Sequence, residues 1–272
     1  MSGGGARRGR DRAGHHPQNG AVNSTTDPSV SVTFAGCGDA FGSGGRFQAC
    51  IHLRPDDAQP VLLECGATSL TALKRCGLDP GEVAAVFVSH LHGDHFGGLP
   101  FLVLDGQFAG RVDPLTVVGP PGTAARLHAA MECLFPGSAV VRRRFAVQVT
   151  ELAPGSTVRA AGVEAAAWAA EHPSGAPALC LRLRLAGKVI GYTGDTAWTG
   201  SIAQVAAGAD LLIAEAYYRD KPVPYHLRLA DLQARQAELA SRRIILTHLS
   251  ADMLAAEDHG YQTASDGLIL RL

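Results

Sequence analysis

Short apolar runs recur along the chain, each bounded by glycine, proline or charged residues. Runs of this length with many valines and isoleucines are typical of buried strands. In the first half they predict strands over residues 30–35, 50–53, 61–63, 83–88 and 115–118. In the second half they predict strands over residues 145–150, 158–159, 163–169, 179–185, 189–192, 210–215, 244–247 and 267–270.

Apolar residues at helical spacing mark three further segments, residues 69–76, 127–134 and 229–239. Gly77 follows the first of them, as expected at the end of a helix. The apolar stretch 101–108 is consistent with a lid or with a packed helix. Two strand-rich halves with helices outside them predict an α/β fold.

The composition is that of one globular domain, except in the first residues of the chain. With 272 residues, 46% of them hydrophobic and 18% charged, the chain can bury one large core. Residues 1–28 are rich in Gly, Arg, Ser and Asn, which predicts a disordered tail followed by a single domain over 29–272.

The charge and cysteine patterns indicate a soluble protein of the cytoplasm. The net charge of −1 gives no whole-protein attraction to nucleic acid or membrane, and no apolar run approaches the length of a membrane span. The six cysteines have neither metal-site nor disulfide spacing, which is typical of reduced thiols.

The most informative stretch is His90-Leu91-His92-Gly93-Asp94-His95, directly after the predicted strand 83–88. Side chains alternate along an extended segment, so His90 and His92 lie on one side of it and can bind one metal. Gly93 frees the backbone to turn. Asp94 and His95, about 100° apart if they open a helix, can then point at a second metal. Imidazoles and a carboxylate suit zinc, with manganese or iron as alternatives.

The motif H-x-H-x-D-H resembles the signature of the metallo-β-lactamase superfamily. Three later segments, each after a predicted strand, stand where that family places further ligands: His172, Asp195 and His248. The resemblance implies a four-layer αββα sandwich and two divalent metal ions. It implies that the first metal is bound by His90, His92 and His172 and the second by Asp94, His95 and His248, with Asp195 shared. Glu64 stands where the family usually has Asp, which puts its usual role behind the metals in doubt.

Within the superfamily the chain is most similar to the ribonuclease Z-like branch. In those enzymes a Glu at a strand end orients a His that serves as general acid, and Glu215 and His226 stand in similar positions. Together with Asp94 they are the predicted catalytic residues. Ribonuclease Z carries a long arm for transfer RNA between the ligands that correspond to His172 and Asp195, whereas this chain has only a short hairpin there.

These features predict a hydrolase that uses a metal-bridging hydroxide, most plainly a phosphodiesterase acting on a cyclic nucleotide or a short nucleic-acid end. A thioesterase or lactonase on the same metal site is an alternative, and a non-catalytic metal-binding scaffold is another. Arg142, Arg143 and Arg144 are consistent with a solvated edge or with contact to substrate phosphates. The expected partners are the small phosphodiester and a second copy of the chain in a homodimer, and no membrane.

Overall fold

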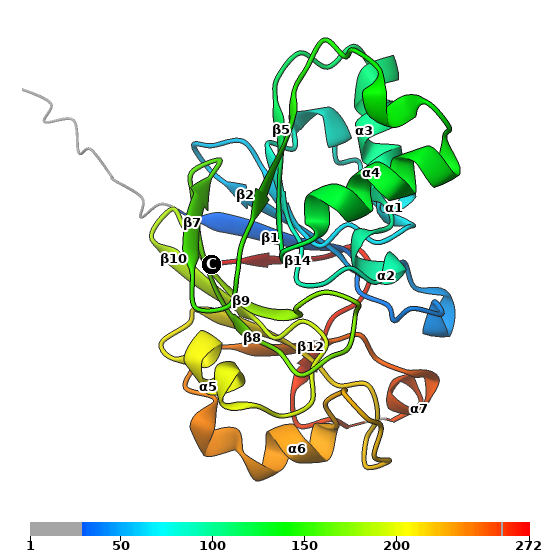
Figure 1. Ribbon diagram of the computed structural model, residues 1–272. Helices are drawn as coiled ribbons and strands as arrows, with labels where there is room; N and C mark the ends of the chain where they lie inside the picture. Colours follow the sequence, from blue (N-terminus) through cyan, green and yellow to red (C-terminus); the bar gives the residue numbers. More distant parts are fainter. Residues whose placement is uncertain (1–28, 257) are drawn as a thin grey trace, which may run out of the picture.

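The computed structural model describes residues 29–256 and 258–272, so the predicted tail over residues 1–28 lies outside the described residues. Two sheets of seven strands each form the centre of the fold (Figure 1). The first sheet has the order β14-β1-β2-β3-β4-β5-β6, and the second has the order β13-β12-β11-β10-β9-β8-β7.

The strands of the first sheet are β1 (Val30–Gly36), β2 (Cys50–Pro55), β3 (Val61–Leu63), β4 (Ala85–Phe87), β5 (Leu115–Gly119), β6 (Val147–Glu151) and β14 (Leu268–Arg271). Those of the second sheet are β7 (Thr157–Ala160), β8 (Val163–Ala169), β9 (Leu179–Leu185), β10 (Lys188–Tyr192), β11 (Leu211–Glu215), β12 (Ile244–Thr247) and β13 (Gln262–Thr263). The α-helices are α1 (Ser69–Arg75), α2 (Gly93–Phe96), α3 (Leu99–Phe108), α4 (Thr123–Leu134), α5 (Gly200–Ala206), α6 (Leu229–Ala234) and α7 (Ala251–Leu254).

Three apolar clusters separate the layers. Phe34 and Ile51 of the first sheet pack with Leu181 and Ile213 of the second, so this cluster fills the space between the sheets. A second cluster joins the outer face of the first sheet to α1, α3 and α4, and a third joins the second sheet to α5, α6 and α7. Figure 1 shows the first three helices on one side of the sheets and the other three on the opposite side. Helix, sheet, sheet and helix therefore follow one another, which confirms the predicted αββα sandwich.

The predicted strands exist, but the sequence did not reveal where two of them pair. Strand β6, expected to open the second half, pairs in parallel with β5 and closes the first sheet. The C-terminal strand β14 returns to pair with β1, also in the first sheet. An apolar run shows that a strand is buried, whereas its partner is set by long-range packing. The stretch 101–108 belongs to α3, whose Leu102 and Val103 are buried against the first sheet, so it is a packed helix.

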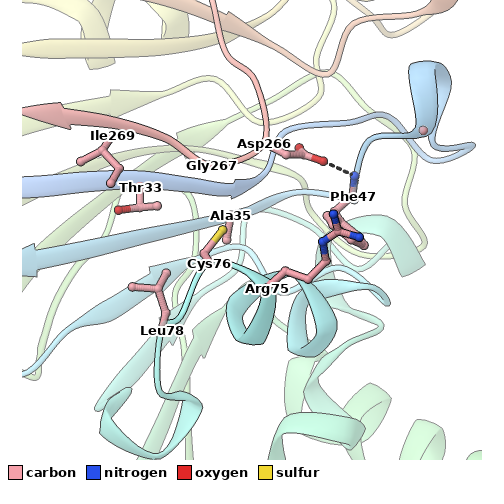
Figure 2. A pocket seen from close by; sticks show the side chains of 10 residues that line it. Thr33, Ala35, Phe47, Arg75, Cys76, Leu78, Asp266, Gly267 and Ile269 are labelled. Atoms are coloured by element: carbon pink, nitrogen blue, oxygen red, sulfur yellow. Dashed lines mark hydrogen bonds between the residues drawn. The ribbon is translucent and has the colours of Figure 1, made fainter.

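A pocket of about 380 Å³ opens where the end of α1 meets β1 and β14 (Figure 2). At its rim, Asp266 accepts a hydrogen bond from the backbone nitrogen of Phe47 at 2.8 Å and another from that of Cys37 at 3.1 Å. These bonds fasten the loop before β14 to the glycine-rich segment after β1.

In the part of the chain that the structure describes, no helix has both the length and the apolar character that crossing a membrane requires.

The turn after β3 holds the histidine motif in place. The backbone nitrogen of Cys65 donates to the carbonyl of His95 at 2.7 Å, and that of Ala67 donates to the carbonyl of Gly93 at 3.1 Å. Gly66 lies so close to the motif that a Cβ there would sit 2.1 Å from the carbonyl oxygen of Asp94. Only glycine therefore fits between β3 and α2.

We expect Gly66→Ala to lower the free energy of unfolding by about 1–3 kcal/mol, because backbone must move to admit the methyl group. Gly93→Ala is the matched control, since a Cβ at that helical position meets nothing within 4 Å. It should leave stability unchanged or slightly higher, because alanine favours helices. Urea denaturation of the two variants measures the difference, and equal effects would contradict this account of Gly66.

Candidate metal centre

The loops that follow β4, β8, β10 and β12 bring the predicted ligands to one edge of the two sheets. Donor atoms of His90, His92 and His172 all lie within 4.8 Å of one another. Donor atoms of Asp94, His95, Asp195 and His248 form a second group of the same size. All the side chains predicted as metal ligands are therefore gathered, in the two sets that the sequence suggested.

Asp195 connects the two groups. One of its oxygens, Oδ2, is 3.9 Å from His90 Nε2 in the first group and 3.4 Å from His248 Nε2 in the second. Its Oδ1 is 3.4 Å from His95 Nε2. Gly194, which has a positive φ of 57°, and the buried Thr193 precede it at the end of β10. A carboxylate in this position can bind two cations at once.

Several donor atoms of the site are buried without a hydrogen-bond partner among the described residues. They are His90 Nε2, both ring nitrogens of His95, Asp195 Oδ1 and His248 Nδ1. Buried polar atoms are normally paired, because an unpaired one costs about 1–3 kcal/mol. Of these atoms, His90 Nε2 and His95 Nε2 face the Asp195 carboxylate, which fits divalent cations, for which imidazole and carboxylate are suitable ligands.

The electrostatics agree with a cation site. Burial alone would raise the pKa of Asp195, but His248 and His95 outweigh it and hold the pKa well below its usual value. Burial would likewise lower the pKa of His248, whereas Asp195 and Asp94 raise it to about 9. The carboxylates are thus anionic and demand positive charge, which protons or metal ions can supply.

Hydrogen bonds behind the ligands fix the orientation of their rings. His172 donates from Nδ1 to the carbonyl of Tyr225 at 3.0 Å. Its other ring nitrogen, Nε2, therefore faces the site, 3.0 Å from His92 Nδ1. Ser89 Oγ is 3.0 Å from His90 Nδ1. Such bonds set the ring nitrogen that faces a metal. The contribution of Tyr225 was not predicted, because the sequence offers no signal for a carbonyl that comes from a distant loop.

Glu64 lies behind His95. It is fully buried, and its two oxygens are each 3.2 Å from the backbone nitrogen of Ser89. Its Oε1 is 3.5 Å from His95 Nδ1. The longer side chain therefore reaches the position from which a carboxylate can orient the imidazole, helped by a left-handed backbone at φ 67°. Strained conformations of this kind also occur at His248 and Tyr225.

His226 and Glu215 lie beside the two ligand groups. His226 Nδ1 donates to Glu215 Oε2 at 2.9 Å and is 3.9 Å from Asp195 Oδ2. Glu215 also accepts a hydrogen bond from the backbone nitrogen of Leu227 at 3.3 Å, so its position is fixed. Burial would lower the pKa of His226, but the hydrogen bond and the charge of Glu215 outweigh it and raise the pKa.

The site opens into a cavity of about 340 Å³ whose lining joins metal-site residues to an apolar wall made of Ala40, Phe41, Tyr217 and Val223. Phe41 is 85% exposed. Asp39 fixes its loop by accepting hydrogen bonds from the backbone nitrogens of Phe41 at 3.2 Å and Ser43 at 2.8 Å. Asp39 therefore fixes the conformation of this loop.

Arg142, Arg143 and Arg144 do not belong to the lining of this cavity. Arg142 and Arg144 are exposed, and Arg143 donates to the carbonyls of Val141 and Ser138. Their arrangement matches the solvated-edge interpretation of these arginines. Phe41 and Tyr217 were not predicted: Phe41 lies in the glycine-rich segment after β1, whose role the sequence left open, and Tyr217 follows β11 with no pattern that marks it.

Comparisons with known proteins agree with this geometry. A family model described as a beta-lactamase superfamily domain matches residues 59–249. Ribonuclease Z of Haloferax volcanii is 28% identical in an alignment of 279 positions that covers 82% of this chain and 85% of that protein. Ribonuclease Z of Methanosarcina acetivorans is 25% identical in an alignment of 274 positions that covers 82% of this chain and 88% of that protein.

Solved structures show the same fold. YhfI of Bacillus subtilis, a metallo-beta-lactamase fold protein, has a TM-score of 0.73 at 20% identity and covers 90% of this chain and 99% of its own. The short form of human tRNase Z has a TM-score of 0.72 at 23% identity, with 88% of this chain and 98% of its own covered. The chain therefore belongs to the metallo-β-lactamase superfamily and is a ribonuclease Z-like, metal-dependent hydrolase.

Proposed function

We propose that this protein is a phosphodiesterase with two divalent metal ions, preferably zinc, and that its substrate is a small phosphodiester such as a cyclic nucleotide or a short nucleic-acid end. The observation that carries the proposal is Asp195, whose carboxylate lies between two groups of ligands and beside the His226–Glu215 pair. His90, His92 and His172 would bind one ion, and Asp94, His95 and His248 the other, with Asp195 between them. Metal ions at such a site supply an activated water and neutralise the charge of a phosphoryl group.

His226 would act as the general acid. Its Nδ1 is bonded to Glu215, so Nε2 carries the proton that is available for transfer. As the bond from phosphorus to the leaving oxygen breaks, this proton passes to that oxygen, and Glu215 holds the ring in position. Asp94, at the same edge, would hold a cation and orient the attacking water.

The size of the substrate follows from the hairpin and the cavity. Strands β9 and β10 are joined by a two-residue turn at Ala186-Gly187, so no arm for a large RNA stands between His172 and Asp195. Among the described residues that line the metal cavity there is no lysine or arginine. The curated relatives are named ribonuclease Z, which supports a nucleic-acid phosphodiester as the substrate class.

Hydrolysis assays test the proposal directly. With metal-loaded protein, turnover of bis(p-nitrophenyl) phosphate is expected, and Asp195→Ala should abolish it because the shared ligand is lost. A thioester and a lactone are assayed in parallel. Turnover of one of these but not of the phosphodiester would overturn the substrate class and keep the metal site.

Replacing the general acid should matter most for poor leaving groups. We expect His226→Ala to reduce kcat about 10²–10⁴-fold for an alkyl phosphodiester and far less for a p-nitrophenyl ester, whose leaving group needs no proton. His128→Ala, an exposed histidine on α4, is the control and should change neither rate. Equal losses on both esters would contradict a role in proton donation.

The pH profile should depend on Glu215. Because a general acid works in its protonated form and Glu215 raises the pKa of His226, activity on an alkyl ester should persist above the ordinary titration range of histidine and be lost as the pH rises through the raised pKa. Glu215→Gln removes the negative charge, so the descending limb should move to lower pH. Identical limbs in the two proteins would exclude His226 as the titrating acid.

Glu64→Gln tests the support of His95. The amide keeps one acceptor oxygen and has no charge, so its nitrogen faces the N–H of Ser89 in either orientation and also His95 Nδ1 in one of them, and the support of His95 is weakened. We expect metal affinity to fall about 10–100-fold, measured by competition with a chromophoric chelator. Glu82→Gln, on the surface, should leave affinity unchanged. Unaltered metal affinity in the Glu64 variant would show that Glu64 does not support His95 as a ligand.

A further inference from the structure

A second groove lies next to the metal cavity, and the two share a wall. The groove has a volume of about 490 Å³, and Val223 and His226 belong to the lining of both spaces. The rest of its lining comes from Glu171, from the loop before α5, from residues 222–225, and from α6 with the residues that flank it. His226 therefore stands at the passage from one space to the other.

The groove combines aromatic surface with a cation. The guanidinium carbon of Arg235 lies 4.9 Å from the centre of the Trp198 ring. Tyr225 is 45% exposed, and Pro222 and Pro224 add rigid apolar surface. Arg235 thus lies over the ring of Trp198, which is half-buried against the third apolar cluster, and the two side chains together form a flat surface on which a base can stack, as bases of single-stranded nucleic acids do on aromatic rings and guanidinium planes.

The charges of the groove do not suit a polyanion. Arg228 is already paired with Asp231, at 2.6 Å and 2.9 Å, so its charge is neutralised. Arg235 Nε is 3.9 Å from Glu238 Oε1, so its charge is also partly balanced, and Glu171 contributes a negative charge to the same lining. The groove is thus close to neutral, which favours an uncharged flat ring over a chain of phosphates.

The position of His226 relates this groove to the reaction. A general acid must contact the leaving oxygen, and Nε2 of His226 is the atom free to do so because Nδ1 is bonded to Glu215. Whatever is attached to the leaving oxygen must therefore extend from His226, and the groove begins there. This step rests on the function proposed above.

We propose that the groove binds the leaving group of the substrate, and that this group is a nucleoside whose base stacks on the Trp198–Arg235 pair. In the reaction the oxygen of water forms a bond to phosphorus and the bond from phosphorus to the nucleoside oxygen breaks. The proton of His226 passes to that oxygen. The products are a phosphate monoester, left in the metal cavity, and a free nucleoside, left in the groove.

Two substrates that differ only in the leaving group test the proposal. Dithymidine monophosphate and the methyl ester of thymidine 5′-phosphate both yield thymidine 5′-phosphate when the leaving group is thymidine in the first and methanol in the second, and the rate measured is the formation of thymidine 5′-phosphate. We expect kcat/KM to be at least about tenfold higher for the dinucleotide, as base stacking provides. Trp198→Ala should remove most of this preference and leave the methyl ester unaffected, whereas Trp198→Phe should retain part of it.

Phe108→Ala is the matched control, because Phe108 is an exposed aromatic residue, 85% accessible, that lines neither space. It should change neither rate. An unchanged ratio of the two rates in Trp198→Ala, or an equal loss on both substrates, would overturn the groove as the leaving-group site while the phosphodiesterase activity stands.

A binding measurement keeps the two proposals apart if no phosphodiester is hydrolysed. The sequence contains two tryptophans, so Trp168→Phe leaves Trp198 as the sole fluorophore of that kind. Titration of this variant with thymidine should give saturable quenching, which Trp198→Phe should not show in its own titration. Absence of quenching overturns the groove as a nucleoside site, whereas quenching without any turnover overturns the proposed reaction and supports the site.

Discussion

The burial of two carboxylates among imidazoles is the constraint on which the rest of the structure depends. Asp195 and Asp94 are almost wholly buried, and His95 and His248 lie within 3.4 Å of their oxygens. Charges removed from water are costly unless they are matched by opposite charge and fixed hydrogen bonds. The two sheets supply the fixed geometry, because each ligand follows a strand whose register is set by the apolar cluster between the sheets. Divalent cations bound by these residues would complete the charge balance.

The same edge joins binding to chemistry. Asp195 lies near both ligand groups and near His226, so one side chain would relate the bound cations to the proposed proton donor. The left-handed backbone at Glu64, Tyr225 and His248 places strain next to the site, and the surrounding packing maintains it. Beyond the predicted ligands, two different surfaces adjoin His226. One is the apolar wall of the metal cavity with Phe41, and the other is the groove with Trp198 and Arg235.

The predicted metal ligands could be identified from the sequence because four of them lie in one short motif and the others each follow a recognisable strand. His90, His92, Asp94 and His95 stand in one motif, and the strands before His172, Asp195 and His248 are visible as apolar runs. Pairing was harder: β6 and β14 both join the first sheet, which only long-range packing decides. Helix α5 was missed because it is short and begins with Gly and Ser, although Ile202, Val205 and Ala206 have helical spacing. The Tyr225 carbonyl and the reach of Glu64 depend on backbone conformation, which residue types do not encode.

The proposed mechanism depends on Asp195 joining two metal ions. Anomalous diffraction from crystals of the metal-loaded protein, collected at the absorption edge of the bound metal, tests this arrangement directly. We expect two peaks about 3.5–4 Å apart, with the Asp195 carboxylate between them. One peak should lie beside His90, His92 and His172 and the other beside Asp94, His95 and His248. A single peak at saturating metal, or two peaks of which one lies away from Asp195, would contradict it.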